Sequence, residues 1–257
     1  MKNLSKNMTL AAALTLAVTA LSGSAMAQDT VAAPAPAVAE AVPDNVVSYN
    51  VALTSDYRYR GISQSRLNPA ISGGADYTHN PTGLYVGTWL SSIKWIKDGG
   101  GDTNLEWDIY AGKRGEISKD FTYDVGSLYY FYPSNGLSTN ANTFELYGQL
   151  GYGPAYIKYS HSTTNLFGVP DSKNSGYLDV GANIDMYEGY LLNLHVGRQK
   201  VEHNDALSYT DYKLGVTKDF GMATVALAYV KANITSLAPN GKNLAKSGLV
   251  LTVSKTF

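Results

Sequence analysis

Three charged residues, Asp56, Arg58 and Arg60, follow one another at intervals of two. In an extended strand this spacing places all three side chains on one face, because successive side chains point to opposite faces. A carboxylate beside two guanidinium groups can form a constriction or bind an anionic group on a solute through charge-assisted hydrogen bonds. The same residues can instead form a stabilising network with carboxylates on neighbouring strands. The spacing alone is compatible with both interpretations.

Further charged residues occupy the polar positions of alternating segments. If the apolar positions face lipid, these charges face inward, because a basic side chain on the lipid face costs about 2–4 kcal/mol at the bilayer midplane. The inward-pointing set is then Asp56, Arg58, Arg60, Asp76, Glu106, Asp108, Arg114, Asp124, Glu145, Lys158, Asp179, Asp185, His195 and Lys213. The candidates that we select as lumen-lining site residues are Asp56, Arg58, Arg60, Asp108, Arg114, Asp124, Glu145, Lys158 and Asp179. Acidic residues outnumber basic ones in the full set, which predicts a mild cation preference if the lumen conducts.

Catalytic and cofactor motifs are missing from the sequence. It contains no Gly-rich phosphate loop, no H-E-x-x-H and no G-x-S-x-G. The four histidines lie in separate segments, so we expect no metal site. The run Asp98-Gly-Gly-Gly-Asp102 offers possible cation ligands, but it is more typical of a flexible external loop. We therefore predict no cofactor and no enzyme, while noting that catalytic groups can be assembled from distant residues.

The elements that must position these charges are strands. Apolar and polar residues alternate in segments such as 47–54, 105–112, 178–187 and 211–216. Most segments run for about 10 to 13 residues, which suits a tilted transmembrane strand better than a soluble strand of about 5 or 6 residues. From residue 45 onward no apolar run approaches the roughly 20 residues of a transmembrane helix.

The connections between these segments alternate between short and long. The short ones are 80–83, 115–119, 151–153, 188–189 and 219–221, and the long ones are 60–66, 97–102, 133–141, 162–174, 200–207 and 235–245. Outer-membrane barrels have short periplasmic turns and longer external loops. We therefore predict an all-β, antiparallel, up-and-down transmembrane barrel of about twelve strands, with both termini in the periplasm. A soluble secreted β-sandwich is the alternative fold.

Composition agrees with a membrane barrel. Charged residues make up 16% of the chain, below the roughly 25% of soluble domains, and tyrosine occurs 20 times. Aromatic residues near segment ends resemble the interfacial girdles of barrels: Tyr57, Tyr59, Tyr77, Trp95, Phe121, Tyr129, Phe131 and Tyr159. Cysteine is absent, and a net charge of −1 gives no reason to expect a nucleic-acid partner.

The N-terminus predicts export. Two lysines precede an apolar run over 9–21, and a small-x-small site ends at Ala27. These features are typical of a secretory signal peptide over 1–27, cleaved after Ala27. Together with the predicted barrel, they indicate the outer membrane as the destination. Residues 28–44 form an Ala/Pro-rich flexible segment, and 45–257 form the barrel.

The C-terminus alternates up to a final aromatic residue. Leu249, Leu251, Val253, Lys255 and Phe257 fall on one face, with Lys255 interrupting the apolar series. A terminal aromatic after such a strand resembles the signal that is recognised by the barrel-assembly machinery. We therefore expect that machinery and outer-membrane lipid as partners.

The segment 45–65 resembles the opening of the TorF family, a bacterial outer-membrane family formerly of unknown function. Its specific part is S-D-Y-x-x-R-G-x-S at 55–63. The resemblance continues, with more generic strand residues, through 68–70, 83–87, 105–112 and 129–133. It implies a barrel and a porin role, and it implies no catalytic residue.

Together these features favour a small porin that admits ions or small polar solutes by passive diffusion through a narrow charged lumen. Barrels of about eight strands are filled by their own side chains, whereas those of sixteen or more leave an open channel. A barrel of about twelve strands lies between these limits. The alternatives are therefore a non-conducting barrel with a structural or interaction role and, third, an outer-membrane hydrolase.

Overall fold

The computed structural model describes residues 43–257 of the chain. The predicted signal peptide and all but the last two residues of the Ala/Pro-rich segment lie outside these described residues. The long strands are β1 (Asn45–Thr54), β4 (Ala70–His79), β5 (Leu84–Ser92), β6 (Leu105–Ser118), β7 (Phe121–Phe131), β8 (Thr143–Tyr152), β9 (Ala155–Ser162), β10 (Gly176–Asp185), β11 (Tyr190–Lys200), β12 (Tyr209–Asp219), β13 (Thr224–Ala232) and β14 (Gly248–Thr256). Short elements in the connections are β2 (Arg58–Tyr59), β3 (Ile62–Ser63), α1 (Trp95–Asp98), η1 (Tyr187–Gly189) and η2 (Asp205–Leu207). Over 43–257 no helix has the length and apolar character needed to cross a membrane.

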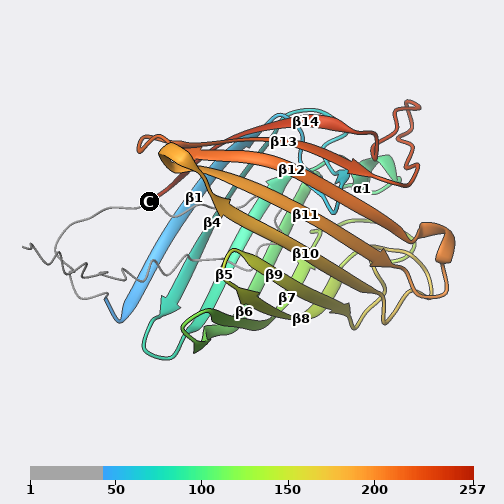
Figure 1. Cartoon of the computed structure of the whole chain (residues 1–257). Coiled ribbons are helices and arrows are strands. Elements are labelled where there is room, and N and C mark those ends of the chain that lie inside the picture. The colour runs from blue at the N-terminus through green and yellow to red at the C-terminus, as the bar shows by residue number, and fades with distance from the viewer. Residues whose placement is uncertain (1–42) are drawn as a thin grey trace, which may run out of the picture.

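The long strands form one closed antiparallel barrel. Each pairs with its neighbours in the chain, and β1 pairs with β14 to close the ring of 12 strands in the described part of the chain. The predicted fold class is therefore confirmed. Short turns and the C-terminus lie at one end, here the turn end, and the long connections and α1 lie at the other, here the loop end (Figure 1). The compartment that each end faces stays a prediction.

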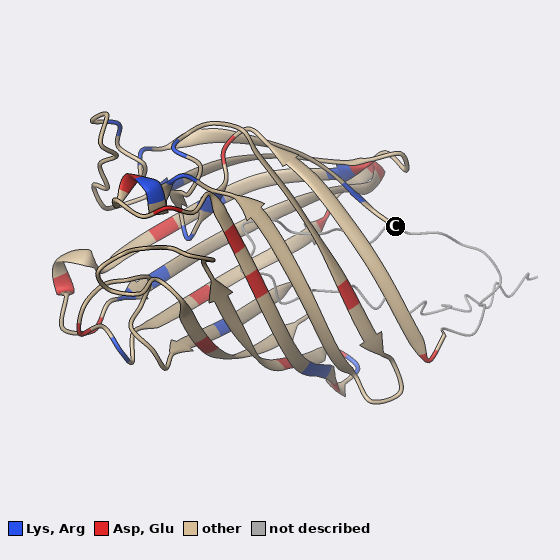
Figure 2. Ribbon diagram, turned by 180° about the vertical axis from the view of Figure 1, so that it is seen from behind, with Lys and Arg blue, Asp and Glu red and all other residues tan. Residues whose placement is uncertain are grey.

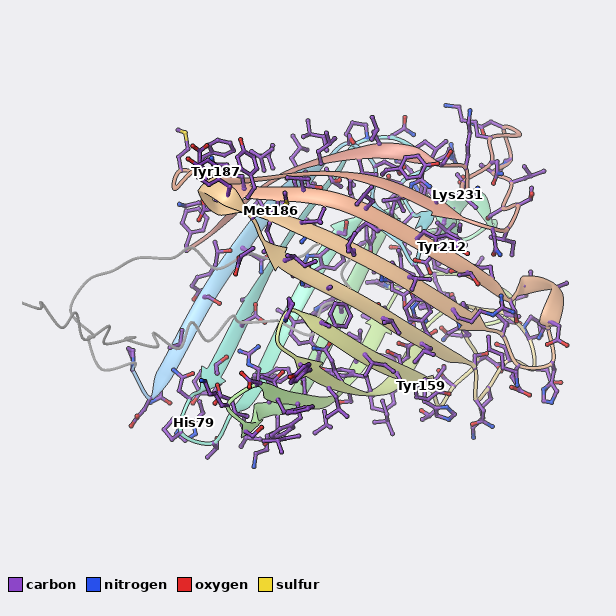
Figure 3. The ribbon with its side chains drawn as sticks, in the orientation of Figure 1. His79, Tyr159, Met186, Tyr187, Tyr212 and Lys231 are labelled. Carbon is purple, nitrogen blue, oxygen red and sulfur yellow. The ribbon has the colours of Figure 1, made fainter. Side chains whose placement is uncertain are left out.

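Side chains alternate between the two faces of the wall. In β14, Leu249 is 68% exposed on the outside, whereas Thr252 is buried on the inside. Figure 3 shows this outer layer of side chains along the whole barrel. An apolar outside with a polar inside is the arrangement expected for a barrel in lipid, since lipid solvates the apolar side chains.

The predicted aromatic girdle is only partly correct. Tyr77, Phe121 and Tyr159 are exposed on the outside of their strands. Tyr57, in contrast, is 4% exposed, and Tyr59 and Trp95 pack against the buried cluster that contains it. These residues were misassigned because they follow the ends of strands and belong to connections that fold inward.

The C-terminus completes the seam between β1 and β14. The backbone N–H of Phe257 donates to the carbonyl of Tyr49 at 2.8 Å, and the N–H of Tyr49 donates to the carbonyl of Phe257 at 3.1 Å. The Lys255 ammonium group donates to the carbonyl of Gly221 in a turn, at 2.5 Å. This last bond gives the residue that interrupts the apolar series a polar partner at the turn end.

Candidate functional site in the barrel lumen

The first long connection, residues 55–69 and here called loop 1, folds into the lumen. Strand β1 ends at Thr54, so Asp56, Arg58 and Arg60 do not lie on one face of that strand as expected. They lie instead in loop 1, where β2 and β3 form a small hairpin. Arg60 has φ 44° and Gly61 φ 80°, so the chain reverses at this point through two left-handed residues. The backbone changes direction here, which brings β3 back alongside β2 within the barrel.

Asp56 and Arg58 hold loop 1 together and attach it to the last long connection, residues 233–247 and here called loop 6. Arg58 Nε donates to Asp56 Oδ2 at 2.5 Å. Its Nη1 donates to the carbonyls of Gly61, Leu244 and Lys246 at 2.9–3.1 Å. Both side chains are almost fully buried, and hydrogen bonds of this kind to a charged group are among the strong ones. This geometry matches the network interpretation for Arg58.

Arg60 crosses the lumen to the opposite wall. Its Nη2 donates to both carboxylate oxygens of Glu145 in β8, at 2.7 and 3.0 Å. Its Nη1 donates to Gln199 Oε1 in β11 at 2.7 Å. The guanidinium group also lies 4.2 Å from the ring centre of Tyr177. Since β8 and β11 lie across the barrel from β1, Arg60 joins loop 1 to the opposite wall. The bond to a carboxylate on another strand fits the network interpretation as well, so a constriction at Arg60 stays a prediction.

Tyrosine–carboxylate pairs cover the inside of β4–β8, here called the tyrosine wall. The hydroxyl of Tyr110 donates to Asp76 at 2.7 Å, and that of Tyr85 donates to Asp124 at 2.6 Å. The hydroxyls of Tyr85 and Tyr147 also contact each other. Nearer the loop end, Glu106 accepts from Tyr57 at 2.5 Å and from Tyr132 at 2.9 Å. Figure 2, which views the barrel from behind, shows acidic positions within the strands.

Glycines on adjacent strands make room for these rings. Tyr85 is paired in register with Gly112, and Tyr147 with Gly126. A Cβ at either glycine would collide with the hydroxyl end of its tyrosine. At these positions glycine and tyrosine depend on each other, because the ring occupies the space that a side chain at the glycine would fill.

A charged stripe crosses the inside of β9–β12. His195 Nδ1 contacts Asp179 Oδ1 at 2.8 Å, and Nε2 contacts Asp211 Oδ2 at 2.7 Å. The Tyr177 hydroxyl also donates to Asp211, at 2.9 Å. Lys158 lies 4.2 Å from the ring centre of Tyr147 and, among residues 43–257, has no carboxylate oxygen within 4.0 Å. The stripe therefore contains the Lys158 ammonium group and a cluster in which the imidazole of His195 lies between the carboxylates of Asp179 and Asp211.

Small side chains on the inside of β13 and β14 leave space in the lumen. A cavity of about 150 Å³ runs along this small-residue wall, which consists of Thr224, Ala226, Ala228, Val230, Val250, Thr252 and Ser254. Thr224 and Ser254 are paired in register near the turn end, and the cavity also reaches Arg58 and Arg60 in loop 1. Open space therefore extends along one side of the lumen, because the opposite side is filled by rings.

Six of the nine site candidates line this cavity: Asp56, Arg58, Arg60, Glu145, Lys158 and Asp179. The other three are placed in the tyrosine wall. Asp124 is bonded to Tyr85, and Arg114 donates to Thr78 at 3.0 Å. Asp108 is buried, and both of its carboxylate oxygens are without a hydrogen-bond partner among the described residues.

Sequence reasoning missed Asp211, Gln199 and the small-residue wall. Asp211 alternates on the same face as Lys213, so the period-two pattern could have found it. Gln199 and the alanines carry no charge and give no signal of a site by residue type. Gln199 matters because it accepts a hydrogen bond from Arg60, and the alanines matter because they line the cavity in the closed barrel.

Comparisons with solved structures find barrels of similar fold. The KdgM porin superposes with a TM-score of 0.53 at 6% identity, over 82% of this chain and 97% of that one. A KdgM porin in complex with disordered oligogalacturonate gives a TM-score of 0.52 at 6% identity, over 82% and 97% of the two chains. The NanC porin gives 0.52 at 11% identity, over 82% and 98%. At these identities the likeness shows a shared barrel fold.

Comparisons of the sequence are less specific. No curated protein matches the chain. Residues 38–257 match a family that is described as bacterial proteins of unknown function, Gcw_chp. The match does not carry the TorF name, so the role implied by that resemblance stays a prediction. Because the match spans most of the sequence, the chain belongs to the Gcw_chp family.

Proposed function

We propose that this protein is an outer-membrane porin through which ions and small polar solutes diffuse along the small-residue wall. The observation that carries the proposal is the cavity that follows β13 and β14 from loop 1 to the turn end. Its lining combines threonine and serine hydroxyls with buried charges, so a hydrated ion or polar solute would meet hydrogen-bonding groups along the way. The narrowest level would be that of Arg60.

We also propose how the barrel is oriented in the membrane. The loop end faces the outside of the cell, and the turn end, with both termini, faces the periplasm. Its support is the contrast between short turns such as 80–83 and long connections such as loop 1. Signal-peptide cleavage after Ala27 belongs to the same proposal. N-terminal sequencing of protein purified from outer membranes should then begin at Gln28.

The first test is the conductance of the processed protein in a planar lipid bilayer. We expect discrete current steps that grow with salt concentration. Reversal potentials in a salt gradient would then test the cation preference, which the pairing of Asp56, Glu145, Asp179 and Asp211 with basic or imidazole groups should keep small. A correctly folded protein that gives no current steps would exclude the porin.

One observation favours a second candidate, a non-conducting barrel with a structural or interaction role. Loop 1 occupies the lumen and is bonded to β8, β11 and loop 6. Loop 1 could therefore act as a plug. The same bilayer experiment separates the two candidates, since a plugged barrel would conduct only after the bonds of Arg60 are removed.

A further inference from the structure

We propose that the outer surface of β11–β13, near the loop end, binds the phosphate-bearing headgroup of an outer-leaflet glycolipid. Arg198 in β11 and Lys231 in β13 both point outward and are exposed. Two exposed aromatic residues lie beside them: Tyr159 in β9 is aligned with Arg198 through β10, and Tyr212 in β12 is opposite Lys231. Basic side chains attract anionic headgroups, and tyrosines prefer headgroup depth, so the four residues together fit a charged lipid at the interface.

The strand register sets the geometry of this surface. Arg198 is opposite Thr210, and Lys231 is opposite Tyr212, so the two cations lie on either side of β12. They are separated by two strand spacings, about 10 Å across the sheet, and by two residues, about 7 Å, along the strand. Figure 3 shows Tyr212 and Lys231 close together toward the loop end. Two long side chains at this separation can reach two phosphates of one headgroup, or one phosphate from both sides.

The cations of this surface keep donors available for a ligand. Arg198 Nη1 makes one hydrogen bond, to Thr210 Oγ1, at 3.3 Å. A guanidinium group has five N–H donors in total. The neighbouring Lys200 is different, because its ammonium group is paired with Glu202 at 2.8 Å. Arg198 and Lys231 are therefore the residues to which we assign the headgroup.

The other side of the barrel has no equivalent surface. Outward positions in the loop-end halves of β1 and β4–β8 carry no lysine or arginine within the described residues. They are apolar or aromatic instead, as at Leu53, Ile71 and Trp107. If basic residues served only to mark the interface with water, they would be expected around the whole ring. Their restriction to one sector indicates a local partner.

The test measures lipid retention by the folded, processed protein. Native mass spectrometry would compare a glycolipid carrying two phosphates with the same lipid after enzymatic removal of its phosphates. We expect the wild type to retain the phosphorylated lipid. The double variant R198A/K231A should lose about 25-fold in apparent affinity, at about five-fold for each cation. Lys113→Ala removes an exposed outward lysine near the turn end and should change nothing.

Several outcomes would overturn this assignment. One is equal retention of the dephosphorylated lipid, and another is equal loss in Lys113→Ala. Displacement of the lipid by millimolar inorganic phosphate would show an ion site instead of a lipid site. If the double variant fails to fold, as judged by heat-modifiable migration, Arg198→Gln alone should give about a five-fold loss. The proposal depends on the outer-membrane orientation above but not on conduction, so a barrel without current that still retains the phosphorylated lipid would leave it intact.

Discussion

Arg60 joins loop 1 to β8 and β11 across the lumen. Replacing it with alanine would remove two bonds to Glu145 and one to Gln199. We therefore expect Arg60→Ala to raise single-channel conductance by about two-fold or more, since the constriction governs passage through a pore. The measurement is current through single channels in a planar bilayer.

Arg66→Ala is a matched control for this prediction. Arg66 also belongs to loop 1, but its Nε donates to Asp98 in the next long connection, at 2.9 Å. Arg66→Ala removes the same charge from the same loop and should leave conductance near the wild-type value. Equal increases in both variants would mean that mobility of loop 1, and not the width at Arg60, controls the current.

Among the elements, β13 and β14 determine where the lumen is open. Ala228 lies in the small-residue wall, so a tryptophan at this position would project into the cavity. We expect Ala228→Trp to lower conductance by at least about half, because the added ring would occupy part of the cavity through which solutes are proposed to pass. The control is Ala111→Trp, which adds the same ring on the exposed outer face of β6. If Ala228→Trp conducts normally, the solute path lies elsewhere.

The strands could be predicted from sequence to a greater extent than the loops. Alternation in segments such as 105–112 depends on neighbours in the chain, so period two is visible without the fold. The position of loop 1 depends instead on Glu145 and on Leu244, which are 85 and 186 residues from their partners in the loop. No local pattern encodes such contacts. Asp56, Arg58 and Arg60 were therefore selected for their charge and spacing but assigned to the wrong element.

At the scale of the whole molecule, closure depends on the last residues of the chain. Phe257 exchanges two backbone hydrogen bonds with Tyr49, and its side chain is exposed on the outside. We predict that removal of Phe257 reduces the amount of folded barrel in the outer membrane severalfold, because it shortens the seam and removes the terminal aromatic. Heat-modifiable migration of outer-membrane fractions measures the folded amount. Phe220→Ala, which removes an exposed aromatic from a turn at the same end, is the control.

The link from Arg58 to loop 6 has a consequence for the order of folding. Its guanidinium group belongs to the first connection of the barrel, and the carbonyls of Leu244 and Lys246 belong to the last. These bonds form only after the final hairpin has been synthesised and brought beside β1. Until then the buried charge of Arg58 lacks half of its acceptors, which favours a hydrated loop 1 in any half-assembled intermediate. We therefore expect loop 1 to take its place in the lumen late, and protection of loop 1 from protease would report that assembly is complete.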